Sequence, residues 1–250
     1  MTARANDDWI IRYGKKIRPA LNRWIARNSL IATTPVLAPA SFAWTDHLEA
    51  NWHDIQRECD ELLAERDAIP PLSEVSPHHR RIDVENRWKS FFFEAHGFQV
   101  EANRARCPRT AELLDQIPGL VTAFYSVMEP GAHVPRHKGI TKALVNVHLG
   151  LRVPAGVEHC RICIDGEDYG WEEGRLFFFD DTFKHEVWND SDRPRAILFI
   201  QVMRPMTRLA TILGKTVIGV VNRTSYIRDA RKKLGATRSR RSPRRLPRAA

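Results

Sequence analysis

From Val121 to Arg204 the chain is a succession of short apolar runs separated by turn residues, and this pattern constrains the fold more than any other. There are six such runs, namely TAFYSVM, VNVHLGLRVP, CRICI, RLFFFD, HEVWN and RAILFIQVM. They are rich in β-branched and aromatic residues, which favour strands, and Asp165-Gly166 is typical of a hairpin turn. So many short strands in one domain predict a β-sandwich or a jelly roll.

Segments of different composition flank this region, so we divide the chain into four parts. Residues 1–45 hold a basic amphipathic helix and a Pro- and Ala-rich linker. Residues 46–206 form the main domain, with its strands at about residues 120–205 and a clear helix near its start. Residues 207–227 carry apolar residues at helical spacing, and residues 228–250 are predicted to be a disordered basic tail.

The net charge of +9 is concentrated in that tail, which contains ten Lys and Arg and one acid. The tail is either simply solvated or binds an anionic membrane surface, and nucleic acid is the less expected partner. The N-terminal helix is equally open, since it can lie in a membrane interface or pack on its own domain. Four cysteines and no recognisable secretory leader lead us to expect a cytoplasmic protein, peripheral on the inner face of the membrane.

Three histidines, His137, His148 and His185, fall within predicted strands or at their starts, and a fourth, His133, lies four residues before His137. Neutral imidazole is the commonest protein ligand for first-row metals, and two distant His with open positions suit non-haem iron(II). A lone strand His is more often a hydrogen-bonded core or surface residue, so spacing by itself leaves both interpretations open. Local context favours the metal, because His137 follows a Pro-Gly turn and His185 follows an acidic turn at a strand start.

Arg195 begins the apolar run AILFI. An Arg that enters a β core is costly unless it meets an anion. The carboxylate of a small cosubstrate is such an anion, and an ion pair with Asp180 or Asp181 is the alternative. We expect the two acids themselves to satisfy backbone groups of the turn before His185 rather than to bind metal.

Several segments match a known family in their residues and joint spacing: NWHDI, NRWKSFFFEAHG, SVMEPGAHVPRHKG, VHLGLRVP, WEEGRLFFFDDTFKHEVWN and the Arg195 strand. From about Asn51 to Pro205 the chain resembles the aspartyl/asparaginyl β-hydroxylase family of iron(II)- and 2-oxoglutarate-dependent dioxygenases. This family includes bacterial lipid A and ornithine lipid hydroxylases. The resemblance implies a mainly β fold with flanking helices around a double-stranded β-helix, a cupin-like jelly roll.

By this resemblance His137 and His185 are the iron ligands and the catalytic centre. Members related to the animal aspartyl hydroxylases lack the usual carboxylate ligand and have Gly two residues after the first His. Gly139 matches that variant, in which water would complete the coordination. The related bacterial lipid hydroxylases have Asp at this place, so Gly139 departs from that branch.

The resemblance also implies that Ser126 and Arg195 bind the far carboxylate of 2-oxoglutarate and that His148 lies near its other end. Asn146 stands where the family usually has an Arg that assists carboxylate binding. Asn donates a hydrogen bond but brings no charge, so we place it among the cosubstrate-binding residues and leave altered or lost activity open.

The implied reaction is hydroxylation of an unactivated C–H bond, with Fe(II) as cofactor and 2-oxoglutarate and O2 as cosubstrates. The basic ends fit an enzyme that works at a membrane surface, so we expect an acyl chain of a membrane lipid as substrate. The alternative is β-hydroxylation of aspartyl or asparaginyl residues in a peptide, or of a free amino acid. A second alternative is a non-catalytic, cupin-like binding module with a basic tail that binds membrane or nucleic acid.

Overall fold

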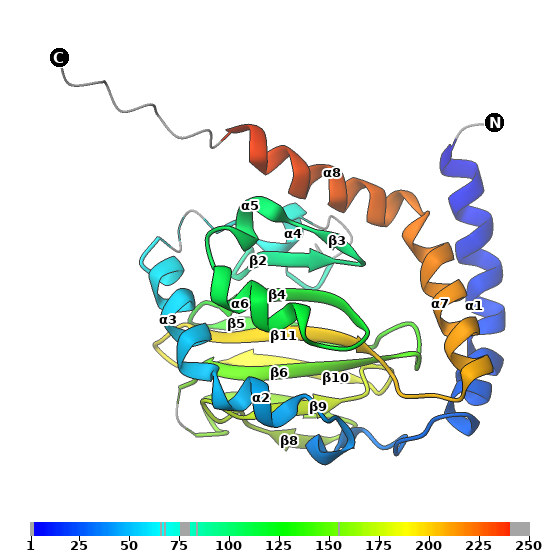
Figure 1. Ribbon diagram of the computed structural model, residues 1–250, viewed down its shortest axis with the longest axis horizontal. Helices are drawn as coiled ribbons and strands as arrows, with labels where there is room; N and C mark the ends of the chain where they lie inside the picture. The colour runs from blue at the N-terminus through cyan, green and yellow to red at the C-terminus, as the bar shows by residue number, and fades with distance from the viewer. Residues whose placement is uncertain are drawn as a thin grey trace.

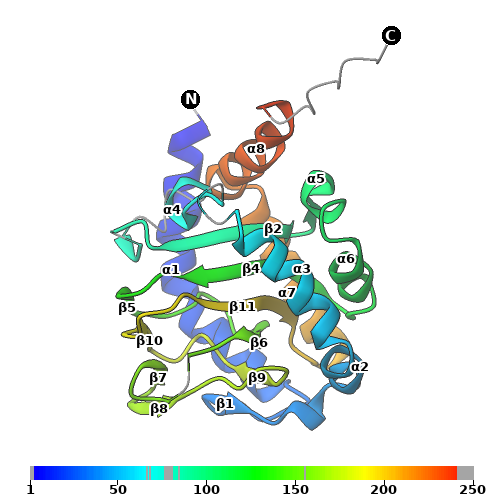
Figure 2. The same ribbon diagram turned by 90° about the vertical axis from the view of Figure 1, so that its left-hand side faces the viewer.

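Two antiparallel sheets form the centre of the molecule, and helices lie around them (Figures 1 and 2). The computed structural model describes residues 3–65, 67, 69–75, 81–83, 85–154 and 156–240. The prediction of a mainly β fold with flanking helices and a double-stranded β-helix core is confirmed.

The larger sheet has seven strands, in the spatial order β1 (Val36–Leu37), β9 (Leu176–Phe179), β6 (Leu144–Arg152), β11 (Arg195–Met203), β4 (Leu120–Met128), β2 (Trp88–Ala95) and β3 (Phe98–Gln99). The smaller sheet has four, in the order β5 (Ala132–His137), β10 (His185–Asn189), β7 (Cys160–Ile164) and β8 (Glu167–Tyr169). The predicted hairpin at Asp165 and Gly166 joins β7 to β8, with φ of 54° and 99° at the two turn residues. Residues of the predicted linker supply β1, which pairs with β9.

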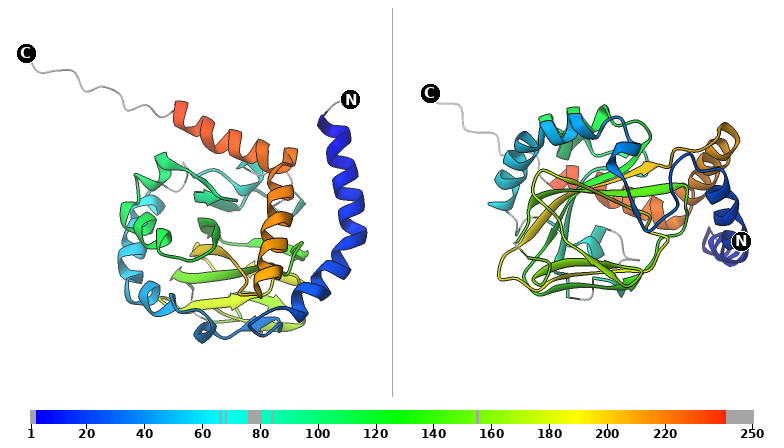
Figure 3. Two further views of the ribbon diagram at one scale, coloured as in Figure 1. Left: turned by 45° about the vertical axis from the view of Figure 1, so that its right-hand side comes forward. Right: turned by 90° about the horizontal axis from the view of Figure 1, so that it is seen from below.

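The helices fall into two groups. On the outer face of the larger sheet and beside it lie η1 (Pro39–Ser41), α2 (Thr45–Ala50), α3 (Trp52–Leu63), α4 (Leu72–Val75), α5 (Glu101–Arg104) and α6 (Pro108–Asp115). At one edge of the molecule α1 (Ala3–Arg27) and α7 (Arg208–Asn222) lie side by side, and α8 (Ser225–Arg240) follows them (Figures 1 and 3). None of the helices in the described part of the chain combines the length and apolarity needed to cross a bilayer.

Strand alternation divides the apolar residues between two cores. Along β6, Val145, Val147 and Leu149 face outward to a core shared with α3 and α6. The residues between them, Asn146 and His148, therefore face the space between the two sheets. That inner space holds a second core, to which both sheets contribute, and the polar residues of the site lie at its margin.

The predicted disordered tail is wrong for residues 228–240, because α8 continues to Arg240. Leu234 is buried against Phe92 and Phe124 of the larger sheet. The Arg231 side chain donates a hydrogen bond to the carbonyl oxygen of His96. These contacts stabilise a helix that its own charged composition does not favour. Residues 241–250 of the predicted tail lie outside the described residues.

The side chain of Glu58 in α3 binds the N-terminus of α6, which lies far from it in the sequence. Its carboxylate, mostly buried, accepts hydrogen bonds from the backbone N–H groups of Arg109 and Thr110, at 2.9 and 2.8 Å, and from the Thr110 hydroxyl at 2.6 Å. The first N–H groups of a helix have no partner within that helix. Glu58 therefore acts as the cap of α6 and ties α3 to α6.

We expect Glu58→Ala to lower the free energy of unfolding by about 2–3 kcal/mol, because two buried N–H groups and a hydroxyl lose their acceptor. Urea unfolding followed by circular dichroism measures the change. The matched control is Glu61→Ala, an exposed acid one turn along α3, which should change stability by less than about 0.5 kcal/mol. Equal effects of the two substitutions would contradict the capping role.

Candidate active site

The imidazoles of His137 and His185 meet inside the barrel. The two residues are cross-strand partners on β5 and β10, and their ring centroids are 4.2 Å apart. Because the smaller sheet is antiparallel, the end of β5 lies beside the start of β10, although the two are nearly fifty positions apart in the sequence. The structure thus brings together the two residues that the sequence predicts as metal ligands.

Both rings are held in the same tautomer by the backbone. His137 Nδ1 lies 2.8 Å from the Pro135 carbonyl oxygen and His185 Nδ1 lies 3.0 Å from that of Phe183. A carbonyl oxygen only accepts, so Nδ1 carries the proton in both rings and Nε2 keeps its lone pair. Burial lowers the pKa of His137 and lowers the pKa of His185 to about 4. Both imidazoles are therefore neutral near pH 7, the form that binds a metal.

Asp181 lies beside Gly139, where a longer side chain at position 139 would project. A Cβ atom built on Gly139 would fall 2.1 Å from Asp181 Oδ1, and the Gly139 N–H donates to the Asp181 carbonyl oxygen at 2.6 Å. Asp181 Oδ1 is buried and has no hydrogen-bond partner. Burial and the adjacent charge of Asp180 raise the pKa of Asp181 to about 7. A carboxylate thus occupies the space that Gly139 leaves open.

Asp180 has a different role from its neighbour. It is fully buried, and its Oδ2 accepts from Lys142 Nζ at 2.7 Å and from Arg204 Nη2 at 2.6 Å. Its Oδ1 accepts from the backbone N–H and the hydroxyl of Thr182. Asp180 therefore fixes the turn before His185, as the sequence indicates.

Arg195 enters the space between the sheets without an anion. Its side chain is 2% exposed, and its Nε and Nη1 atoms have no hydrogen-bond partner. Its Nη2 atom lies 2.7 Å from Met128 Sδ, and its Cζ atom lies 4.5 Å from the centre of the Trp171 ring. Burial lowers the pKa of this guanidinium. The predicted alternative, an ion pair with Asp180 or Asp181, does not form, because Asp180 pairs with Arg204 and Lys142 and Asp181 contacts Asn146.

His148 presents a second unused donor near Arg195. The Trp171 indole N–H donates to His148 Nδ1 at 3.1 Å, so the proton of this ring is on Nε2. That Nε2 atom is buried and has no partner. Burial first, and then the charge of Arg195, hold the pKa of His148 well below its usual value. Two residues therefore offer three donor nitrogens without an acceptor, Nε and Nη1 of Arg195 and Nε2 of His148, around one tryptophan.

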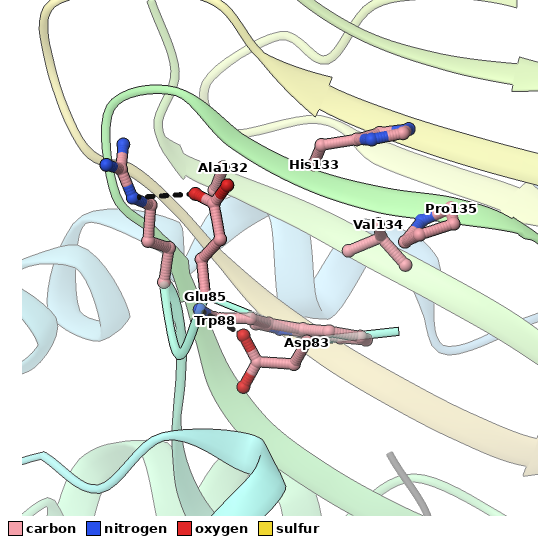
Figure 4. A pocket seen from close by; sticks show the side chains of 8 residues that line it. Asp83, Glu85, Trp88, Ala132, His133, Val134 and Pro135 are labelled. Atoms are coloured by element: carbon pink, nitrogen blue, oxygen red, sulfur yellow. Dashed lines mark hydrogen bonds and ion pairs between the residues drawn. The ribbon is translucent and has the colours of Figure 1, made fainter. Parts of the chain in front are cut away.

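Ser126 lies on the same inner side of the larger sheet. It is buried on β4, and its hydroxyl oxygen accepts from the Trp88 indole N–H at 2.9 Å. The hydroxyl hydrogen of Ser126 thus stays available for an acceptor. The Trp88 ring also lines a pocket of about 130 Å³ beside β5 (Figure 4). The lining residues are Asp83, Glu85, Arg87, Trp88, Ala132, His133, Val134 and Pro135, so the pocket adjoins Ser126 and contains none of the predicted site residues.

Asn146 contacts Asp181 rather than Arg195. Its Nδ2 group donates weakly to Asp181 Oδ2 at 3.4 Å, and its Oδ1 atom accepts from Gln201 Nε2 at 2.9 Å. The predicted role of Asn146 in cosubstrate binding stays a prediction. Sequence reasoning missed Gln201, Met128 and the position of Asp181. Only the acidic pair before His185 was a signal, and it did not tell one acid from the other.

No group of three or more His, Cys, Asp or Glu side chains in the described residues is arranged to hold a metal ion. The ligand set of two imidazoles stays a prediction, and Asp181 is the carboxylate that lies beside Gly139. The donor set suits a transition metal that keeps several open positions.

A sequence model of the aspartyl/asparaginyl beta-hydroxylase family matches residues 49–205 of the chain. The ornithine lipid ester-linked acyl 2-hydroxylase of Rhizobium tropici is 32% identical over 199 residues, which cover 80% of this chain and 71% of that protein. The human aspartyl/asparaginyl beta-hydroxylase is 35% identical over 163 residues, 63% of this chain but only 21% of the human protein.

Among solved structures, a Pseudomonas putida prolyl-4-hydroxylase is 18% identical, with a TM-score of 0.39 over 61% of this chain and 87% of that one. The family match spans well over half of the chain and includes every residue of the site described above. The chain therefore belongs to the aspartyl/asparaginyl beta-hydroxylase family.

Proposed function

We propose that this hydroxylase depends on iron(II) and 2-oxoglutarate, with the metal on His137 and His185 and the cosubstrate on Arg195. The observation that carries the proposal is the set of unpaired N–H groups of Arg195 and His148 inside the barrel. A buried cation without a partner is destabilising by several kcal/mol, so its presence indicates a ligand that neutralises it.

The chemistry of these donors fits a carboxylate. Arg195 offers two donor nitrogens without a partner and His148 offers one, while the Ser126 hydroxyl lies on the same inner face. Guanidinium groups bind carboxylates through paired, charge-assisted hydrogen bonds, which are strong where water is excluded. Trp171 holds both donors, through its indole N–H to His148 and its ring face to Arg195. A dicarboxylic acid reaching from Arg195 towards the two imidazoles would satisfy them.

His137 and His185 would hold the iron through their Nε2 atoms, which the backbone contacts at Nδ1 leave free. When bound, iron and 2-oxoglutarate supply the oxidising power for inserting one oxygen atom of O2 into a C–H bond. Asp181 would act beside Gly139 by accepting a hydrogen bond from water on the metal. Asp180 and Arg204 would keep the His185 turn in place, since their ion pair is fully buried.

We infer that the substrate is an acyl chain of a lipid. The Rhizobium tropici relative, which this chain covers for 71% of its length, is by name an acyl 2-hydroxylase. Asn146 brings no charge, and both ends of its amide are already engaged by Gln201 and Asp181. A carboxylate of an aspartyl substrate would find no cation there. The similarity to the human enzyme and Gly139 favour the alternative, peptidyl aspartate or asparagine.

Cells that produce the protein should contain membrane lipids with one extra oxygen on an acyl chain, detectable by mass spectrometry. His185→Ala removes an iron-binding nitrogen and should abolish this product. The control is His133→Ala, which lies on the outer side of β5 and pairs with Glu186; it should leave the product unchanged. Unmodified lipids together with hydroxylated aspartyl or asparaginyl peptides would shift the assignment to the alternative. Product formation by the His185→Ala variant would contradict the metal site.

Arg195→Met should separate stability from binding. We expect the affinity for 2-oxoglutarate to fall by about 100-fold, on the order of 3 kcal/mol, because the carboxylate loses its cation. The free energy of unfolding should stay the same or rise, since a buried unpaired charge is removed. Calorimetric titration with a manganese-loaded protein and urea unfolding give the two values. Arg152→Met, which removes a surface partner of Asp60, is the control, and an equal loss of affinity there would refute the assignment.

Asp181→Asn should reduce turnover by about tenfold while leaving the fold intact, because an amide is a weaker acceptor for water on a metal. Gly139→Ala should produce the same defect, since the added Cβ would displace the Asp181 carboxylate. Succinate formation per enzyme measures both, and circular dichroism reports the fold. Lys184→Ala, an exposed change in the same turn, should have no effect. Full activity in both site variants would show that Asp181 has no part in the reaction.

A further inference from the structure

The apolar stripe of α7 faces solvent. Leu209 is 74% exposed and Ile212 is 63% exposed, and Leu213 and Val220 continue the same stripe at helical spacing. On the side of α7 that packs on the protein, the buried residues are Ala210 and Gly214, and Val217, Ile218 and Val221 are half-buried. A surface helix of a soluble domain normally has the opposite arrangement, with its large apolar residues inside.

The neighbouring helix α1 has the same property. Ile17 is 61% exposed and Trp24 is partly exposed, whereas Ile25 is buried in the contact that α1 and α7 share with Met206. The two helices lie side by side at one edge of the molecule, beside the barrel (Figures 1 and 3). Leu30, just after α1, is also largely exposed. Exposed large apolar residues thus gather on one helix pair.

Both helices are cationic: α1 carries seven Lys and Arg against Asp7 and Asp8 near its start, and α7 carries Arg208 and Lys215 and no acid. Residues 9–45 carry six Lys and Arg and neither Asp nor Glu, and residues 205–228 carry four Lys and Arg and neither acid. Helices that lie in the interface of an anionic bilayer typically carry large apolar side chains, often including a tryptophan, with cations between them. A second copy of the chain is a poor occupant, because a two-fold contact would bring these cations against each other.

This helix pair is joined to the metal site through one short loop. The loop of residues 138–143 follows His137 directly and contains Gly139. The Asn22 side chain of α1 donates to the Ile140 carbonyl oxygen at 3.2 Å and accepts from the Lys142 N–H at 3.0 Å. Ile140 itself is 56% exposed. The loop that leaves the site therefore extends the exposed apolar residues of α1 and α7.

We propose that α1, α7 and Ile140 form a docking face that rests on an anionic lipid bilayer and places the loop after His137 against the membrane. The bilayer would then supply the acyl chain to the adjacent barrel. In this last respect the inference rests on the proposed lipid substrate, whereas the docking itself does not.

Cosedimentation of the full chain with vesicles, without iron or 2-oxoglutarate, tests the docking. The protein should bind phosphatidylcholine vesicles that contain phosphatidylglycerol and bind poorly to phosphatidylcholine alone. The double variant Leu209→Ser, Ile212→Ser should bind the anionic vesicles about tenfold more weakly or worse, because two interfacial side chains no longer insert. Val157→Ser, an exposed apolar residue in the loop before β7, is the matched control and should bind as the wild type does.

Undiminished binding by the double variant would overturn the proposal, since the basic C-terminal residues would then suffice. Equal binding of the wild type to neutral and anionic vesicles would overturn it as well. So would a wild-type dimer in analytical ultracentrifugation that the double variant converts to a monomer. Hydroxylation of detergent-dispersed lipid without vesicle binding would refute the docking face alone, whereas vesicle binding without any hydroxylation would support the docking and count against the proposed reaction.

Discussion

The site is organised around a guanidinium that the fold buries but does not neutralise. Arg195 lies at the start of β11, the central strand of the larger sheet, and two of its nitrogens, Nε and Nη1, have no acceptor. Trp171 and Met128 pack against it, and neither removes its charge. A protein tolerates this energetic cost where the charge is used for binding. The proposed dependence on a carboxylate cosubstrate rests on this one unsatisfied group more than on any other feature.

The antiparallel sheets explain how so few residues produce a complete site. β5 and β10 bring two imidazoles to one point, and carbonyl oxygens two residues before each ring set the tautomer. On the other sheet, alternation directs Ser126, His148 and Arg195 inward, while their strand neighbours fill the outer core with α3 and α6. The proposed metal ligands and the proposed anion-binding residues thus come from different sheets that share an inner core.

Two adjacent acids show how burial assigns different tasks to the same residue type. Asp180 forms ion pairs with two cations and accepts two further hydrogen bonds. It therefore fixes the turn before His185 and, through Arg204, the segment that leads into α7. Asp181 receives almost nothing, and burial together with its neighbour's charge raises its pKa to about 7. A carboxylate that the protein leaves unsatisfied beside Gly139 is available to a ligand, whereas the satisfied one is structural.

The sequence by itself determined the succession of strands and the turn at Asp165-Gly166, because both depend on local residue patterns. It also identified His137, His185 and Arg195 as candidate site residues, since a cation within an apolar run is visible in the sequence. It did not separate Asp180 from Asp181, foresee that Asn146 contacts Asp181, or predict α8 over residues 228–240. Tertiary structure decided these, since each depends on partners far along the chain. The same holds for α7: helical spacing revealed its apolar stripe, but only the packing of Ala210 and Gly214 on the protein turned that stripe to the outside.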